Sequence, residues 1–130
     1  MDVMTVENGY EADECRIVVH TMTGMCLIRL VGDVDLAVAA RLRATLAAAV
    51  AEQPWIIVDL SRVGAIDSVA LGVLAAAGQA ARRGPGGLLL AAAPPFVTEV
   101  LRAARLSTVF TMFATVPAAM TTVLAQPAPL

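Results

Sequence analysis

The hydrophobic positions of this 130-residue chain fall into short runs whose period changes several times. Residues 15–22 and 25–31 are rich in β-branched and apolar side chains, and only Thr23 and Gly24 separate the two runs. This pattern predicts a β-hairpin in which Cys26 lies opposite Thr21. Cys15 would then lie roughly 20 Å from Cys26 at about 3.3 Å per residue, so an intrachain disulfide is not expected.

A helical period appears after the hairpin and returns along the chain. Residues 36–51 form an amphipathic stretch with Asp35 as the candidate N-cap. Residues 68–83 repeat the period and end at a glycine-rich stop, and residues 95–105 begin with a proline. In that third helix we expect Phe96, Val100 and Leu101 to face inward. A short last helix is predicted over residues 117–124.

Apolar runs between these helices predict further strands. Residues 55–60 and 88–92 are almost entirely apolar, as expected of strands covered on both faces. A loop is predicted over residues 61–67, and an edge strand over residues 109–113. Strand–helix–strand units form right-handed parallel crossovers, so the order predicts one α/β domain with a mixed sheet of about four to five strands and about four helices.

The ends of the chain read differently from its centre. Residues 1–13 are polar and acidic and predict a flexible leader, residues 14–125 the domain, and residues 126–130 a tail. The beginning of the chain has no basic flank and no apolar segment typical of a signal peptide. The long uncharged stretch from Leu106 onward contains threonines and Pro117, so it predicts strand, turn and helix rather than a membrane span. We therefore expect a cytoplasmic protein.

Composition narrows the function classes. Hydrophobic residues make up 58% and charged residues 15% of the chain, which predicts a compact core. The net charge is −2, and no basic cluster is larger than Arg82-Arg83. Nucleic-acid binding requires a basic face, so nucleic acid is not an expected partner. Insertion into a membrane is not expected either.

Polar side chains gather where two predicted parallel strands end. The strand that ends at Val31 leads into Asp33 and Asp35, and the strand that ends at Leu60 leads to Asp67-Ser68. One crossover links these strands, so their carboxyl ends point the same way and the four side chains should share one edge of the molecule.

Ser68 stands where a loop becomes a helix, and two interpretations remain open for it. In the first, Ser68 or Asp67 is simply the N-cap of the helix. In the second, Ser68 accepts a phosphoryl group, which the unpaired N–H groups and dipole of a helix start would stabilise. The phosphate would place about −1.5 to −2 charges beside three carboxylates.

Enzymatic interpretations find little support. No catalytic residue, cofactor site or metal site is predicted, because the chain lacks a G-x-S-x-G elbow, a phosphate-binding loop and any metal-ligand spacing. Its single histidine, His20, lies in the first predicted strand. A hydrolase that uses Ser68 with Asp33 or Asp35 would lack a general base in the right place.

Two segments resemble the STAS domain family. LVGDVDL, residues 30–36, looks like the G-[ED]-[LV]-D element of these domains. IVDLSRVGAIDSVALGVL, residues 57–74, looks like their strand–loop–helix signature, usually D-L-S-x-[VL]-x-x-[IM]-D-S-[ST]-G-L-G-x-L. The resemblance covers about residues 14–125 and implies a single STAS-type domain.

The resemblance also implies a role for the serine. Anti-sigma-factor antagonists of this family bind an anti-sigma factor, often a serine kinase, and so free a sigma factor. The kinase phosphorylates the serine after the motif's aspartate, here Ser68, and a phosphatase reverses this. We expect a monomer or weak dimer whose partner-binding residues lie on the edge and along an exposed stripe of the second helix: Asp33, Asp35, Asp67, Leu71, Ala75 and Arg82.

The motif is incomplete at one point. The usual [ST]-G pair after the serine is Val69-Ala70 here, which adds a methyl group at the helix start and removes a hydroxyl. A constitutive scaffold subunit of the same fold, such as the small STAS partner of an ABC-type lipid transporter, is therefore the alternative function.

Overall fold

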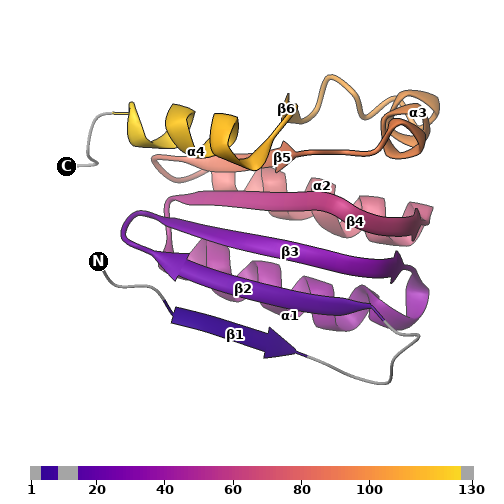
Figure 1. Ribbon diagram of the computed structural model, residues 1–130, viewed down its shortest axis with the longest axis horizontal. Helices are drawn as coiled ribbons and strands as arrows, with labels where there is room; N and C mark the ends of the chain where they lie inside the picture. Colours follow the sequence, from indigo (N-terminus) through magenta and orange to yellow (C-terminus); the bar gives the residue numbers. More distant parts are fainter. Residues whose placement is uncertain (1–3, 9–14, 127–130) are drawn as a thin grey trace.

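Six strands form one sheet in which spatial neighbours follow the chain order (Figure 1). The computed structural model describes residues 4–8 and 15–126. Pairs β1–β2 and β2–β3 are antiparallel, and the remaining neighbours are parallel, so the predicted mixed α/β sheet is confirmed. The strands are β1 (Met4–Asn8), β2 (Arg16–Met22), β3 (Met25–Val34), β4 (Trp55–Ile66), β5 (Gly87–Ala91) and β6 (Thr111–Phe113).

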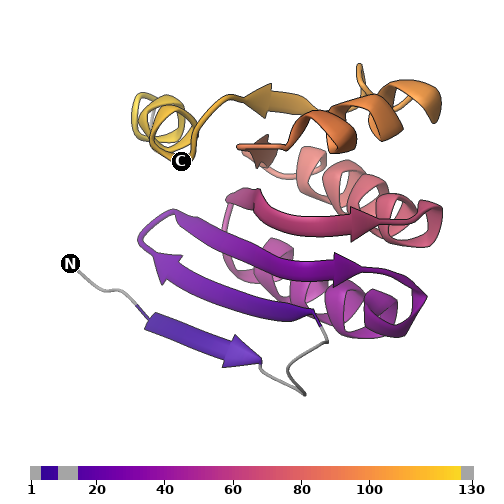
Figure 2. The same ribbon diagram turned by 45° about the vertical axis from the view of Figure 1, so that its right-hand side comes forward.

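The four predicted helices are present and divide between the two faces of the sheet (Figures 1 and 2). The larger core cluster joins the even-numbered side chains of β3 to three helices: α1 (Leu36–Glu52), α2 (Ser68–Arg82) and α3 (Pro95–Ala103). A smaller cluster lies on the other face, where α4 (Val116–Leu124) packs over β4 and β5. Alternate residues of a strand point to opposite faces, which explains how one strand serves both clusters.

The predicted hairpin is confirmed in its register. Cys26 lies opposite Thr21, and Gly24 in the turn has a φ of 84°, a conformation that favours glycine. Cys15 and Cys26 are both free and buried. Burial raises the pKa of each thiol above its ordinary value, so both are held as neutral thiols.

Two predicted irregular segments are regular in the structure. Residues 4–8 form strand β1, so the prediction of a flexible leader is wrong there. The rest of the predicted leader, residues 1–3 and 9–13, lies outside the described residues, and so do residues 127–130 of the predicted tail. The predicted loop 61–67 is also wrong, because β4 continues to Ile66. The β3–β4 pairing shifts register twice, between Arg29 and Val31 and between Gly32 and Asp33, so the extra residues of β4 fit beside β3. Gly32, at the second shift, has a φ of 108°.

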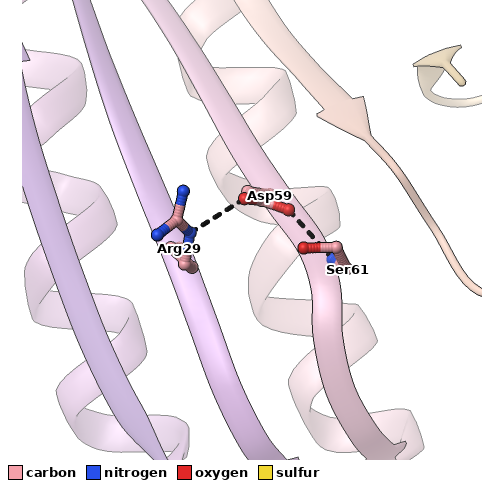
Figure 3. A network of polar contacts seen from close by, with 3 residues as sticks. All are labelled: Arg29, Asp59 and Ser61. Atoms are coloured by element: carbon pink, nitrogen blue, oxygen red, sulfur yellow. Dashed lines mark hydrogen bonds and ion pairs between the residues drawn. The ribbon is translucent and has the colours of Figure 1, made fainter. Parts of the chain in front are cut away.

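A polar contact lies in the middle of the β3–β4 pair (Figure 3). Arg29 Nε donates to Asp59 Oδ2 over 2.9 Å, and the backbone N–H of Ser61 donates to Asp59 Oδ1 over 2.9 Å. Asp59 is the one buried charged side chain among the described residues. Burial alone would raise the pKa of Asp59, but the hydrogen bonds from Ser61 and the Arg29 ion pair outweigh it and lower that pKa.

Candidate functional site

The starts of α1 and α2 lie at the end of the sheet where β3 and β4 finish (Figure 1). Asp35 is the N-cap of α1, and its Oδ1 accepts the N–H of Ala37 over 3.1 Å. Asp67 is the N-cap of α2, and its Oδ1 accepts the N–H of Ala70 over 2.9 Å. Of the two N-cap candidates open for α2, the structure therefore selects Asp67, and the Ser68 side chain is not used as a cap.

Strand pairing holds the two helix starts together. Asp33 pairs with Ala65 and Val34 with Ile66, and the N–H of Asp67 donates to the carbonyl of Val34 over 3.1 Å. Neighbouring strands lie about 4.8 Å apart, so the residues that follow them are close neighbours. The structure thus brings Asp33, Asp35, Asp67 and Ser68 to one edge, as predicted. We call this edge, with Leu36 and Val69, the rim.

The side chain of Asp33 lies close to the neighbouring strand. A Cβ atom on Gly64 would lie 2.8 Å from Asp33 Oδ1, so a larger residue at position 64 would require this exposed carboxylate to move. Asp33 is exposed, although it belongs to β3 rather than to the loop expected after Val31. It therefore adds negative charge to the rim from the strand side.

Ser68 is the first residue of α2, and its side chain is exposed. No described residue forms a hydrogen bond with its hydroxyl. Asp67 accepts the N–H of Ala70 with its carboxylate and that of Leu71 with its carbonyl, so the N–H groups of Ser68 and Val69 keep no partner among the described residues. An exposed hydroxyl beside two unpaired N–H groups is a place where added negative charge can be accommodated.

Sequence reasoning missed an apolar component of this site. Leu36 is 69% exposed, Val69 40% and Phe96 39%. They occupy the first or second positions of α1, α2 and α3, which begin at the same end of the sheet (Figure 1). Phe96 was expected to face inward, but Val97 takes that place in the core. Their shared position in the first helical turn is a signal that the sequence contained.

The predicted stripe along α2 is mostly wrong as a surface. Leu71 is only 2% exposed and belongs to the core, because α2 is covered by more than the sheet. Ala75 is half-buried and packs against the same core. Arg82 is exposed but lies fourteen residues from Ser68, about 21 Å along the helix, where it bonds the carbonyl of Val109. None of the three can lie on the rim.

The departure from the family motif has a structural explanation. Ala70 is completely buried, so its methyl group points into the core rather than toward an approaching protein. Val69 is the residue of the pair that reaches the surface. The methyl group that Ala70 adds is therefore not at the surface, and the change that remains there is the replacement of a hydroxyl by the apolar side chain of Val69.

Within residues 4–8 and 15–126, no three His, Cys, Asp or Glu side chains come together as a metal-ligand set. None of their helices has the length and apolar character needed to cross a membrane.

Comparison with known proteins settles the family. The profile of the STAS domain matches residues 16–119. The chain belongs to the STAS domain family. This family assignment covers the strands and helices that form the rim, including the motif around Ser68. A search of curated proteins found no significant match.

Solved structures share the STAS fold. An anti-sigma factor antagonist from Mycobacterium paratuberculosis is 26% identical, with a TM-score of 0.77 over 89% of this chain and 99% of that one. The anti-sigma factor antagonist SpoIIAA, solved in unphosphorylated and phosphorylated forms, is 23% identical in the former, with a TM-score of 0.75 over 86% and 99%. A sulfate transporter family protein from Wolinella succinogenes is 18% identical, with a TM-score of 0.70 over 80% and 88%. The last two likenesses concern the fold alone.

Proposed function

We propose that this STAS domain is an anti-sigma-factor antagonist, a binding module rather than an enzyme, whose attachment to an anti-sigma factor is switched by phosphorylation of Ser68. The observation that carries the proposal is the exposed Ser68 hydroxyl beside two unpaired N–H groups at the start of α2. A kinase can reach this hydroxyl without opening the core. We place the protein in the cytoplasm, where sigma factors act, and propose a phosphatase that restores the unmodified form.

The charge of the rim explains how a phosphate would control binding. Asp33, Asp35 and Asp67 already place three carboxylates around the helix starts. A phosphate adds about −1.5 to −2 charges, and the N–H groups of α2 stabilise it within this chain. A partner that contacts the unmodified rim meets the added charge directly. A hundredfold loss of affinity needs only about 2.8 kcal/mol, which one misplaced charge at an interface can supply.

The apolar side chains of this end would provide the affinity that the phosphate removes. Leu36, Val69 and Phe96 are three of the four large hydrophobic residues that are exposed among the described residues. All three lie at the end of the sheet where α1, α2 and α3 begin, and protein interfaces have an apolar centre and a polar margin. We propose that the anti-sigma factor covers these three residues and that Asp33, Asp35 and Asp67 lie at the margin of the contact.

The direct test is phosphorylation in vitro. The protein is incubated with ATP and, in turn, each anti-sigma-factor kinase encoded in its own genome, and the product is mapped by mass spectrometry. We expect one phosphate, on Ser68, and none on the Ser68→Ala variant. Ser61, exposed and seven residues upstream, provides a matched control as Ser61→Ala, which should still be modified. Modification at another residue, or of no residue with any of these kinases, would reject the proposal.

A constitutive scaffold is the second candidate function. The STAS domain of a sulfate transporter family protein has the same fold, and Val69 replaces the hydroxyl usual after the motif serine. A scaffold such as the partner of an ABC-type lipid transporter would bind equally well with alanine or aspartate at position 68. Affinity-purification from the native host with each variant distinguishes the two: recovery of an anti-sigma factor by Ser68→Ala alone supports the switch, and recovery of transporter subunits by both supports the scaffold.

A further inference from the structure

An apolar groove runs between α1 and α2 on the side of these helices that faces away from the sheet. Its volume is about 340 Å³. Leu46 of α1 and Val73 of α2 form its floor and are 1% and 5% exposed, whereas the wall residues Ala47 and Ala76 are exposed. Small side chains on both helices leave the groove open, with exposed alanine walls above a floor of buried core residues.

The groove has a charge at one end. Arg43 lines it and is exposed, and no hydrogen bond or ion pair joins its guanidinium to another described residue. In contrast, Arg29 and Arg102 are paired with Asp59 and Glu99. Arg43 is the single charged residue that lines the groove, whose remaining lining side chains are alanine, leucine and valine. The surface thus combines an apolar channel with one uncompensated cation.

The dimensions follow from helix geometry. On α1 the lining residues extend from Arg43 to Ala51, eight positions further along the helix, which at 1.5 Å per residue is about 12 Å. On α2 they extend from Val73 to Ala80, about 10 Å. Both helices follow parallel strands and run the same way, so Arg43 and Val73 mark the same end. An extended chain advances about 1.2 Å per bond, so about ten carbon atoms match the length of the groove.

From this shape and charge we infer that the groove binds a free straight-chain carboxylate of about ten carbons, with its alkyl chain between α1 and α2 and its carboxylate on Arg43. The alkyl chain removes the exposed alanine walls of the groove from water, and the carboxylate pairs with a guanidinium that has no partner among the described residues. This site is separate from Ser68, so the inference does not depend on the proposed function.

The test is titration with saturated carboxylates of six, eight, ten and twelve carbons, below their micelle concentrations, followed by calorimetry and by ¹H–¹⁵N NMR spectra. Complete burial of a methylene group strengthens binding about fourfold, and a groove open on one side buries about half of it. We therefore expect about twofold tighter binding per added methylene, with no further gain beyond about ten carbons. Amide shifts should concentrate on residues 43–51 and 73–80.

Matched variants separate the two parts of the site. Ala76→Leu fills the groove and should weaken decanoate binding about tenfold or more, whereas Ala48→Leu, exposed on α1 outside the groove, should leave it unchanged. Arg43→Gln should reduce the affinity for decanoate to that for neutral decanol, and Arg62→Gln should not. Equal binding of decanoate and decanol by the unmodified protein, affinity independent of chain length, or a dimer that Ala76→Leu dissociates would overturn the inference.

Discussion

The starts of α1 and α2 are built in the same way on neighbouring strands, yet they differ in what they can bind. In both, an aspartate caps the helix with Oδ1. In α1 the Asp35 side chain and carbonyl accept the N–H groups of Ala37 and Val38, so the N–H of Leu36 before them has no partner among the described residues. In α2 the acceptors of Asp67 reach one residue further along, and the two N–H groups before Ala70 have no partner in the described part of the chain.

The first residues sharpen this contrast. α1 begins with Leu36, which is exposed and has no group to modify, whereas α2 begins with the Ser68 hydroxyl. One helix start thus offers apolar surface, and the other offers an exposed hydroxyl, the group that we propose is phosphorylated. Two helix starts with the same cap therefore differ through the position of the cap's hydrogen bond and the identity of the next side chain.

The largest expected effect is on partner binding at α2. Ser68→Asp places a fixed negative charge at the helix start and should weaken binding of the anti-sigma factor about 100-fold, whereas Ser68→Ala should change it less than about threefold. Calorimetric titration of the purified partner measures both. Equal affinities of the two variants would show that charge at this start does not control binding, and the contrast with α1 would lose its meaning.

The next effect concerns the strands that carry both starts. Arg29→Met leaves Asp59 buried without its ion pair and should lower the free energy of unfolding by about 2 kcal/mol, less than for a fully buried pair because Arg29 is 42% exposed. Urea unfolding measures the loss. Amide exchange should accelerate at Ala37 and Ala70 alike, and acceleration at only one start would contradict their attachment to a common ladder.

The same pair has a defined pH dependence. Asp59 has a lowered pKa in the folded protein, so its contribution to stability is present above its ordinary pKa of about 3.9 and is lost as the pH falls through the lower folded-state value. Removing Arg29 raises that folded-state pKa toward the unfolded-state value, so Arg29→Met should lose less stability than the unmodified protein as the pH falls from 6 to 2. Unfolding curves over this range measure the two losses, and equal losses for both proteins would reject the prediction.

The two caps should differ modestly. Asp67→Ala should cost about 1 to 1.5 kcal/mol of unfolding free energy, because Asp67 is half-buried, and Asp35→Ala about 0.5 kcal/mol, because Asp35 is exposed. Asparagine at either position retains an acceptor oxygen and serves as the control. A larger loss of unfolding free energy for Asp35→Ala than for Asp67→Ala would contradict this prediction, because it would show that the N-cap of α1 contributes more stability than that of α2.

The smallest effect on stability is expected at Leu36. Leu36→Ala removes an exposed side chain, so the free energy of unfolding should change by less than about 0.5 kcal/mol. Affinity for the anti-sigma factor should nevertheless fall several-fold, because Leu36 belongs to the proposed contact. Leu124→Ala, equally exposed at the end of α4, is the control that should alter neither quantity. Unchanged binding by Leu36→Ala would remove α1 from the interface.

The sequence was sufficient for the parts of the fold governed by local chemistry. The turn at Gly24 set the hairpin register, and the aspartates before two helical stretches marked their starts. The crossover rule then placed Ser68 beside Asp33 without knowledge of any distance. Each of these conclusions depends on residues close together in the chain or on a rule of chain connection.

The errors arose where distant segments decide the structure. Residues 61–66 have little apolar pattern, and they are strand because β3 continues alongside them. Leu71 was expected on the surface but is buried, because α2 is covered on several sides. Phe96 was expected in the core but is exposed, because α3 places Val97 there instead. Neither the packing around an alanine-rich helix nor a ladder with irregular register is encoded in the period of one segment.

The β3–β4 ladder continues through two register shifts as far as Val34 and Ile66, and this pairing limits how the proposed phosphorylation of Ser68 can act. The N–H of Asp67 donates to the carbonyl of Val34, which ties the start of α2 to the end of β3. If Ser68 is phosphorylated as proposed, we expect the added charge to act on a bound partner directly through its electric field, without rotation of α2. The dissociation rate of the partner would then set how fast the proposed switch responds.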